Sequence, residues 1–126
     1  MKKKIINTSK APAAIGPYSQ GVRVGDLVYT SGQIPINSAT GEMETDIKKA
    51  TKQSMENVKA ILEEVGTTLD NVIKTTIYVK DMNDFTSVNE IYASYFKETP
   101  PARSCIEVVR LPKDAVIEIE AIAVVK

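Results

Sequence analysis

Hydrophobic and polar positions along the chain follow two different periods. Apolar residues recur at about every 3.6 positions over residues 46–65, which predicts a helix with one buried face. These residues are Ile47, Ala50, Val58, Ile61, Leu62 and Val65. We expect Thr45 to cap the start of this helix and Gly66 to end it. A similar stripe predicts a second helix over residues 83–97. Its members are Phe85, Val88, Ile91, Tyr92, Tyr95 and Phe96.

The remaining patterned segments alternate with a period of two, which is typical of strands. In residues 71–81, Ile73, Thr75, Ile77 and Val79 alternate with Lys74, Thr76, Tyr78 and Lys80. Two short β-rich runs within residues 20–35 are joined at Gly25-Asp26, a hairpin signal. The last two strands are "ARSCIEVV" and "AVIEIEAIAVV", joined by "RLPKD". No element is expected before residue 20, and the Lys2-Lys3-Lys4 run is interpreted as a frayed, solvated terminus.

The predicted order is strand, strand, helix, strand, helix, strand, strand. It indicates an α+β fold, a single domain over residues 1–126 in which a mixed sheet carries both helices on one face. On the last strand, one face carries Val116, Glu118, Glu120, Ile122 and Val124. A solvated face would not normally keep Ile122 and Val124. We therefore expect a partner chain to cover this face and its polar end to line a cleft.

Composition narrows the possible chemistry. Lys plus Arg and Asp plus Glu each number 16, so no overall field attracts nucleic acid or an anionic membrane. The chain has no histidine, which removes the commonest general base and metal ligand together. We expect no metal and no cofactor. With one cysteine and no leading apolar segment, the protein is expected to be cytoplasmic.

Three side chains of the C-terminal strands are candidates for chemistry, and each has a plainer interpretation. Arg103 is either an edge-strand arginine paired with a nearby glutamate or a fork for a substrate carboxylate, whose two oxygens match two parallel N–H donors. Glu118 is either an exposed strand residue or an acid-base group. Cys105, without a histidine, is more often a small packing residue than a nucleophile.

The segment "PPARSCIEVVRLPKDAVIEIEAIAV" resembles the C-terminal signature of the Rid family, the reactive intermediate deaminases also called YjgF-like proteins. The resemblance extends through "APAAIGPYSQ", "YTSGQIP", "QSMENVKAILEEVG", "VIKTTIYVKDMNDF" and "VNEIYASYF". So long a collinear match is more specific than any single motif. Val109 departs from it, because the family usually has a smaller residue there.

The resemblance implies a chorismate-mutase-like fold and a homotrimer whose three sheets enclose a barrel, with clefts between subunits. It also implies hydrolysis of 2-imino acids such as 2-iminobutanoate and 2-iminopropanoate, products of pyridoxal-phosphate dehydratases, to 2-oxo acids and ammonia. By similarity, Arg103 holds the substrate carboxylate, and Glu118 activates water with help from the Cys105 carbonyl. The residues that complete the cleft are Tyr18, Ser31, Gly32 and Asn89. Strand parity alone does not separate Glu118 from Glu120.

Other functions remain open at this point. A non-catalytic trimer that binds small carboxylic acids would use Arg103 without needing Glu118. A regulatory partner of other proteins is a further possibility within the same family. Ribonuclease activity has been attached to relatives, but balanced charge and the lack of clustered basic and aromatic residues argue against a nucleic-acid surface.

Overall fold

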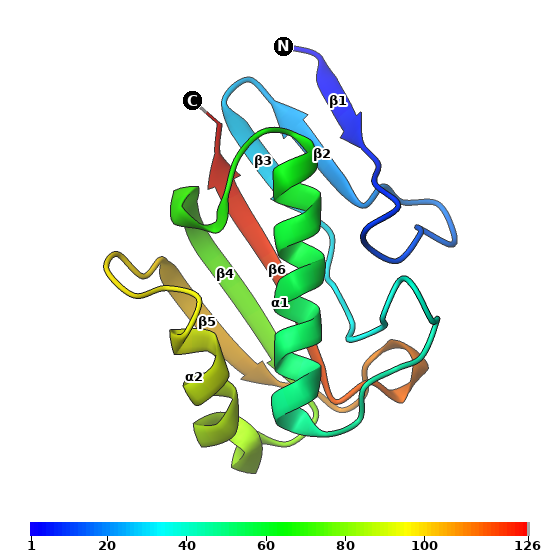
Figure 1. Ribbon diagram of the computed structural model, residues 1–126, viewed down its shortest axis with the longest axis vertical. Helices are drawn as coiled ribbons and strands as arrows, with labels where there is room; N and C mark the ends of the chain where they lie inside the picture. The colour runs from blue at the N-terminus through cyan, green and yellow to red at the C-terminus, as the bar shows by residue number, and fades with distance from the viewer. Residues whose placement is uncertain (126) are drawn as a thin grey trace.

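The computed structural model describes residues 1–125, which form one mixed sheet with two helices on one of its faces (Figure 1). The strands are β1 (Lys3–Ile6), β2 (Gly21–Val24), β3 (Leu27–Thr30), β4 (Val72–Val79), β5 (Ala102–Glu107) and β6 (Ile117–Val124). The helices are α1 (Ile47–Glu64) and α2 (Phe85–Ala93). Single 3-10 turns span Leu69–Asn71, Met82–Asp84 and Pro112–Asp114. The α+β class and the placement of both helices on one face are confirmed.

The six strands lie in the order β1-β2-β3-β6-β4-β5. Every neighbouring pair is antiparallel except β4 and β5, which are parallel and connected through α2. A parallel pair requires such a crossover, whereas β2 and β3 need only the Gly25-Asp26 turn between them. Gly25 has a φ of +58°, which favours glycine. The predicted hairpin is therefore confirmed.

Helix α1 lies across the middle of the sheet (Figure 1). Of the predicted stripe it buries Ala50, Val58, Ile61 and Leu62, while Ile47 and Val65 at its ends are partly buried. Its cap differs from the prediction, because the side chain of Asp46, not Thr45, accepts a hydrogen bond from the Lys49 N–H at 3.1 Å. At the other end Gly66 adopts a φ of +86°, and the Thr67 N–H reaches back to the Leu62 carbonyl at 3.1 Å. This is a Schellman motif, so the predicted stop at Gly66 is confirmed.

Helix α2 is shorter than the predicted residues 83–97. The turn before it is capped by Asp81, whose side chain accepts from the Asn83 N–H at 2.9 Å. After Ala93 the backbone tightens, because the Tyr95 N–H bonds to the carbonyl three residues before it. The Ser94 hydroxyl also donates to the Ile91 carbonyl at 2.6 Å. Such local side-chain bonds compete with the helix.

Strand β1 contradicts the expectation that no element precedes residue 20. Residues Lys3–Ile6 pair in antiparallel register with β2, Ile5 lying opposite Val22. The Lys2-Lys3-Lys4 run is thus partly the start of an edge strand rather than a frayed terminus. A run of four residues carries a weak local signal, and lysines are common on exposed strand edges.

The alternation predicted for residues 71–81 is wrong at its first position. A register shift between Val72 and Lys74 in the pairing with β6 places Val72 in the core and leaves Ile73 47% exposed. From Thr75 onward the predicted alternation holds, with Thr75, Ile77 and Val79 buried. A bulge inserts one residue and so changes which side chains face the core.

The helices cover only one face of the sheet. Ile117, Ile119, Ala121 and Ala123 of β6 are buried beneath them, whereas the alternate residues Glu118, Glu120, Ile122 and Val124 are only partly buried. Cross-strand register extends the second face through Tyr29 and Ile5, which are 46% and 56% exposed. Within residues 1–125, no segment of this chain covers that face.

Candidate functional site

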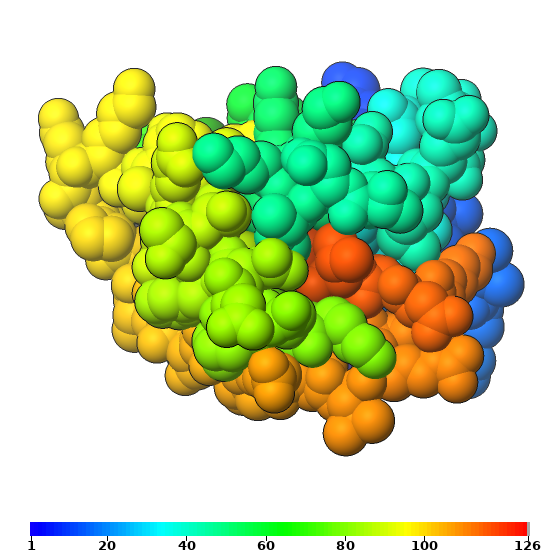
Figure 2. Space-filling view, turned by 90° about the horizontal axis from the view of Figure 1, so that it is seen from below, coloured from blue at the N-terminus to red at the C-terminus, as the bar shows by residue number. Residues whose placement is uncertain are grey.

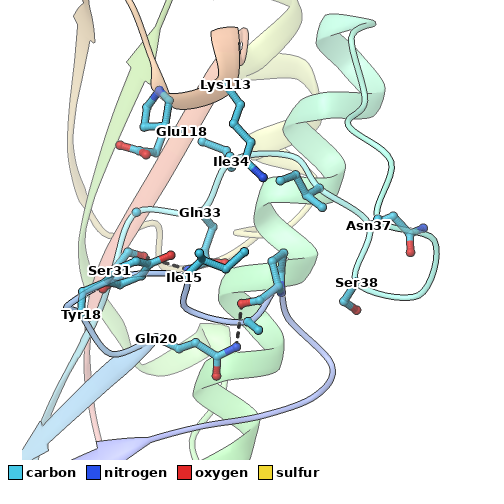
Figure 3. A pocket seen from close by; sticks show the side chains of 16 residues that line it. Ile15, Tyr18, Gln20, Ser31, Gln33, Ile34, Asn37, Ser38, Lys113 and Glu118 are labelled. Carbon is cyan, nitrogen blue, oxygen red and sulfur yellow. Dashed lines mark hydrogen bonds between the residues drawn. The ribbon is translucent and has the colours of Figure 1, made fainter.

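A cavity of about 680 Å³ opens beside the end of the sheet where β6 begins (Figure 3). Its walls come from the loop before β2, the segment after β3, the turn before β6 and the first part of β6 itself. Of the predicted site residues, Tyr18, Ser31, Gly32 and Glu118 line it. Glu120 does not, so the structure separates two glutamates that strand parity could not.

Glu118 reaches the cavity past Gly32. A Cβ atom added at Gly32 would lie 2.6 Å from Cδ of Glu118 and 2.8 Å from its Oε2, far inside normal contact. The missing side chain at position 32 is therefore what lets the carboxyl group occupy this position. Burial, followed by the negative charge of Glu120, raises the pKa of the Glu118 carboxyl above its ordinary value.

The loop that carries Tyr18 is fixed by the buried amide of Gln20, which is not among the predicted site residues. The Gln20 side chain accepts from the Thr8 N–H at 2.7 Å and donates to the carbonyls of Thr8, Ala11 and Pro12. It is 2% exposed and lies beside the cavity (Figure 3). No local pattern marks such a glutamine, because its partners are loop backbone groups that only the fold brings together.

Ser31 connects this loop to the end of β3. Its hydroxyl donates to the Ser19 carbonyl at 2.6 Å, and its N–H donates to the Gln20 carbonyl at 2.8 Å. Tyr18 itself is 53% exposed, with its ring at the cavity edge (Figure 3). Lys113, also absent from the predicted set, lines the same cavity. Its backbone has a φ of +55°, uncommon for a residue with a side chain.

Arg103 and Asn89 form a second cluster, between β5 and α2. Nη1 of Arg103 donates to Oδ1 of Asn89 at 2.5 Å. The guanidinium carbon lies 5.3 Å from the centre of the Phe85 ring and 5.1 Å from that of Tyr92. Both aromatic residues belong to the apolar stripe predicted for the second helix, a pattern that gives no sign of contact with a cation.

The guanidinium of Arg103 has no carboxylate partner within residues 1–125, where the ion pairs are Lys48–Glu90 and Arg110–Asp114. Glu107, which shares the face of Arg103 on β5, instead accepts from the Met82 N–H at 2.8 Å. The plainer interpretation of Arg103, a pair with a neighbouring glutamate, is therefore not what the structure shows. A half-buried cation held by neutral groups is suited to an incoming anion.

Cys105 lies on the same face of β5 and packs against the core. Burial raises the pKa of its thiol, an effect that the positive charge of Arg103 partly offsets. A thiol with a raised pKa is a poor nucleophile at neutral pH. Its side chain therefore fits the interpretation of a packing residue.

The two clusters lie on opposite faces of the sheet. Arg103 is in register with Thr75 on β4, and Thr75 is in register with Ala121 on β6, so these three side chains share the helix-covered face. Glu118 is three positions from Ala121 and faces the other way. None of the residues of the Arg103 cluster lines the cavity that contains Glu118. One copy of the chain thus carries two separate halves of the predicted site.

Figure 2 shows the end of the molecule that lies at the bottom of Figure 1. There α2 and the turn before it, in yellow-green, lie next to the segment that follows β5, in orange. Lys80, directly after β4, also contacts this segment, because its Nζ donates to the Val109 carbonyl at 2.7 Å. Val109 is 92% exposed, so its greater size relative to the family pattern does not tighten packing within this chain.

Comparisons with known proteins agree with one another. Residues 8–125 match the model of the family described as Endoribonuclease L-PSP. The chain is 56% identical to the 2-iminobutanoate/2-iminopropanoate deaminase of Escherichia coli K12, over 96% of this chain and 97% of that one. It is 59% identical to a RutC family protein of Haemophilus influenzae, with full coverage of both chains. The crystal structure of E. coli TdcF with bound serine superposes with a TM-score of 0.94 at 50% identity, covering 98% of this chain and 99% of that one.

No helix within residues 1–125 is long and apolar enough to cross a membrane.

Proposed function

Because this chain belongs to the family described as Endoribonuclease L-PSP, in which the Rid deaminases it resembles are found, we propose that it hydrolyses 2-imino acids to 2-oxo acids and ammonia. The observation that carries the proposal is its 56% identity, over nearly the full length of both chains, to an E. coli protein named for deamination of 2-iminobutanoate and 2-iminopropanoate. The reaction class suits a chain without histidine, because an imine carbon is electrophilic once its nitrogen is protonated.

In this proposal Arg103 binds the substrate carboxylate. Asn89 occupies one N–H of the guanidinium, and the remaining N–H groups stay available for the two carboxylate oxygens. The two parallel N–H donors of the Arg103 guanidinium hold the carboxylate and so fix the position of the adjacent C=N carbon. This orientation lowers the barrier to attack by water on that carbon.

Glu118 supplies the proton transfers. Its carboxylate takes a proton from water as the water oxygen bonds to the imine carbon, and it then returns that proton to the amine nitrogen. The C–N bond then breaks and ammonia leaves with its electron pair. Glu118 accepts the hydroxyl proton at the same time, so the oxygen stays on the carbon as a carbonyl group, and the ammonia takes up this proton as it departs as ammonium. A positioned acid-base group contributes about 10²- to 10⁴-fold, and a raised pKa brings the carboxyl closer to the working pH.

A composite site between copies of the chain follows from the separation of the two halves. Arg103 and Asn89 of one copy would face Tyr18, Ser31, Gly32 and Glu118 of another, with the Cys105 carbonyl assisting. The uncovered sheet face, which includes Ile122 and Tyr29, supports an assembly in which three such faces meet as a homotrimer. An oligomer of this kind would bury the exposed apolar residues that a monomer leaves in water.

The test is a coupled assay in which a threonine dehydratase generates the imine and the appearance of 2-oxobutanoate is followed with and without the protein. We expect acceleration by the wild type and none by Arg103→Ala, with the oligomeric state of that variant unchanged in analytical ultracentrifugation. An Arg103→Ala variant with the full wild-type rate would refute the assignment. Mixing Arg103→Ala with Glu118→Ala should restore part of the rate if the halves come from different copies, and no restoration would contradict the composite site.

A non-catalytic carboxylate-binding trimer is the second candidate, favoured by the serine bound in the structure of E. coli TdcF. It needs Arg103 but not Glu118. Glu118→Ala separates the two functions, because an enzyme loses turnover while keeping its affinity for a small carboxylic acid. Endoribonuclease activity, which the family description names, is tested by RNA cleavage and by salt-dependent RNA binding, and we expect neither from a chain of zero net charge.

A further inference from the structure

The guanidinium of Arg103 is held between aromatic rings on one face of α2. Phe85, Asn89 and Tyr92 follow one another at spacings of four and three residues, which places them on the same side of a helix. The rings of Phe85 and Tyr92 lie 5.3 Å and 5.1 Å from the guanidinium carbon, and Asn89 between them accepts its N–H. Cation–π attraction at such distances holds the plane of a cation without neutralising its charge.

Tyr92 is itself fixed from the sheet. Its hydroxyl is 2.6 Å from Oγ1 of Thr75, and its ring packs against Phe96 with 4.9 Å between centres. The side chain is 6% exposed, and Thr75 is 1% exposed. Thr75 is also the register partner of Arg103 across β4 and β5. The ring beside the cation is thus anchored to the strand neighbouring the one that carries the cation.

We propose that Tyr92, locked by Thr75 and assisted by Phe85, is a positioning residue that aims the Arg103 guanidinium at the substrate carboxylate. The inference rests on the proposed function, in which Arg103 is the carboxylate anchor. A long arginine side chain loses considerable rotamer entropy when it binds a ligand, and a side chain already held in place loses less. Neutral rings do this without occupying the donors that the carboxylate needs, whereas a glutamate partner would compete with the substrate.

The matched variants are Tyr92→Leu, which removes the ring, and Tyr92→Phe, which keeps the ring and loses the bond to Thr75. Tyr95→Leu is the control, because Tyr95 lies on the turn after the same helix, bonds to Glu56 on α1 at 2.8 Å and does not touch Arg103. Binding of 2-oxobutanoate, a stable small carboxylate, is measured by calorimetry on each full-length protein in its native assembly.

We expect Tyr92→Leu to weaken 2-oxobutanoate binding by about tenfold and Tyr92→Phe by about two- to threefold, within the range of a partly buried cation–π contact. Tyr95→Leu should bind like the wild type. In turnover, Tyr92→Leu should raise KM for the imine more than it lowers kcat. Thermal unfolding of each variant is measured beside these assays. It separates a general loss of stability from a loss of the orientation of the Arg103 guanidinium.

A spectroscopic readout reports the position of the guanidinium directly. The arginines of the chain are Arg23, Arg103 and Arg110, so their Nε–Hε signals in ¹⁵N NMR are few, and Arg103→Ala assigns the one of interest. At the distances of Phe85 and Tyr92 from the guanidinium, we expect their ring currents to displace this signal in the wild type. It should move toward the Arg23 and Arg110 signals in Tyr92→Leu. If Tyr92→Leu fails to fold, Tyr92→Phe and Thr75→Val provide the same test. In each of them the ring-current displacement of the Arg103 signal should be smaller than in the wild type, and 2-oxobutanoate should bind more weakly.

The outcomes distinguish this inference from the proposed function. If Arg103→Ala binds 2-oxobutanoate as tightly as the wild type, the role of Arg103 and the inference both fail. If Arg103→Ala loses binding while Tyr92→Leu keeps both the affinity and the displaced signal, only the inference is overturned. If the variants follow the expected pattern but the wild type does not hydrolyse imines, the positioning role stands and the proposed enzyme activity fails.

Discussion

Replacing Gly32 with alanine tests whether the location of the Glu118 carboxyl group controls the rate. The added Cβ would lie 2.6 Å from Cδ and 2.9 Å from Cγ of Glu118, whereas ordinary contact begins at 3.4 Å. Gly32 is not at a positive φ, so alanine fits the backbone and the clash falls on a side chain that can move. The carboxyl group must therefore retreat by roughly 1 Å, a displacement that can lower kcat by about 10²-fold.

Such a loss corresponds to about 2.7 kcal/mol of transition-state free energy. The assay is the dehydratase-coupled measurement of 2-oxobutanoate formation, run beside thermal unfolding and 2-oxobutanoate binding. Because the added Cβ meets the side chain of Glu118, which can move, we expect the fold to persist while turnover falls.

A double-mutant cycle sharpens the test. Glu118→Asp shortens the side chain and makes room for the alanine, so the two substitutions together should cost less than their separate costs added. Full activity in Gly32→Ala would refute the argument that this glycine positions the carboxyl group. Strict additivity with Glu118→Asp would show that the loss has another origin.

Three other predictions follow from the titration of Glu118 and from the cap of α1. The rate should fall as the pH drops through the raised pKa of Glu118, because the carboxylate becomes protonated. Glu120→Gln removes a repelling negative charge and should therefore shift this acid limb of the pH–rate profile to lower pH. An unchanged profile in Glu120→Gln would exclude an effect of the Glu120 charge on the pKa of Glu118. A carboxyl group whose folded pKa is raised contributes stability below its unfolded pKa and loses it as pH rises through the folded pKa. Glu118→Gln should therefore raise the melting temperature at neutral pH but not in acid, and an equal gain at both pH values would contradict this. Asp46→Ala should lower the free energy of unfolding by about 1 kcal/mol in denaturant titrations, whereas Thr45→Ala should leave it unchanged, and the reverse order would restore Thr45 as the cap.

Most of the secondary structure could be predicted from the chain because it depends on neighbours in the sequence. The apolar stripe of α1 and the glycine that ends it lie within a few residues of one another, so local energetics decide the element. The same holds for the Gly25-Asp26 hairpin. Asp46 and Thr45 are adjacent and both residue types cap helices, so the path of the backbone selects between them.

The candidate residues were identified by a resemblance that covers nearly the whole chain, but their arrangement was not. Arg103 and Glu118 are 15 positions apart in the sequence and both lie in alternating strands. Alternation assigns side chains to one of two faces within each strand. It does not say which face of β5 corresponds to which face of β6, because that depends on the pairing of both strands with β4.

The sequence by itself determined the element types, the single sheet with helices on one face, and the set of polar residues available for chemistry. Tertiary structure alone decided that β1 joins the sheet and that Ile73 turns outward at a bulge. It also decided that Tyr92 packs against a cation and that the two halves of the site lie on opposite faces. The physical reason is that helix and strand periods arise from local backbone geometry. Strand order, register and side-chain partners instead come from contacts between distant segments, whose free energies no local pattern records.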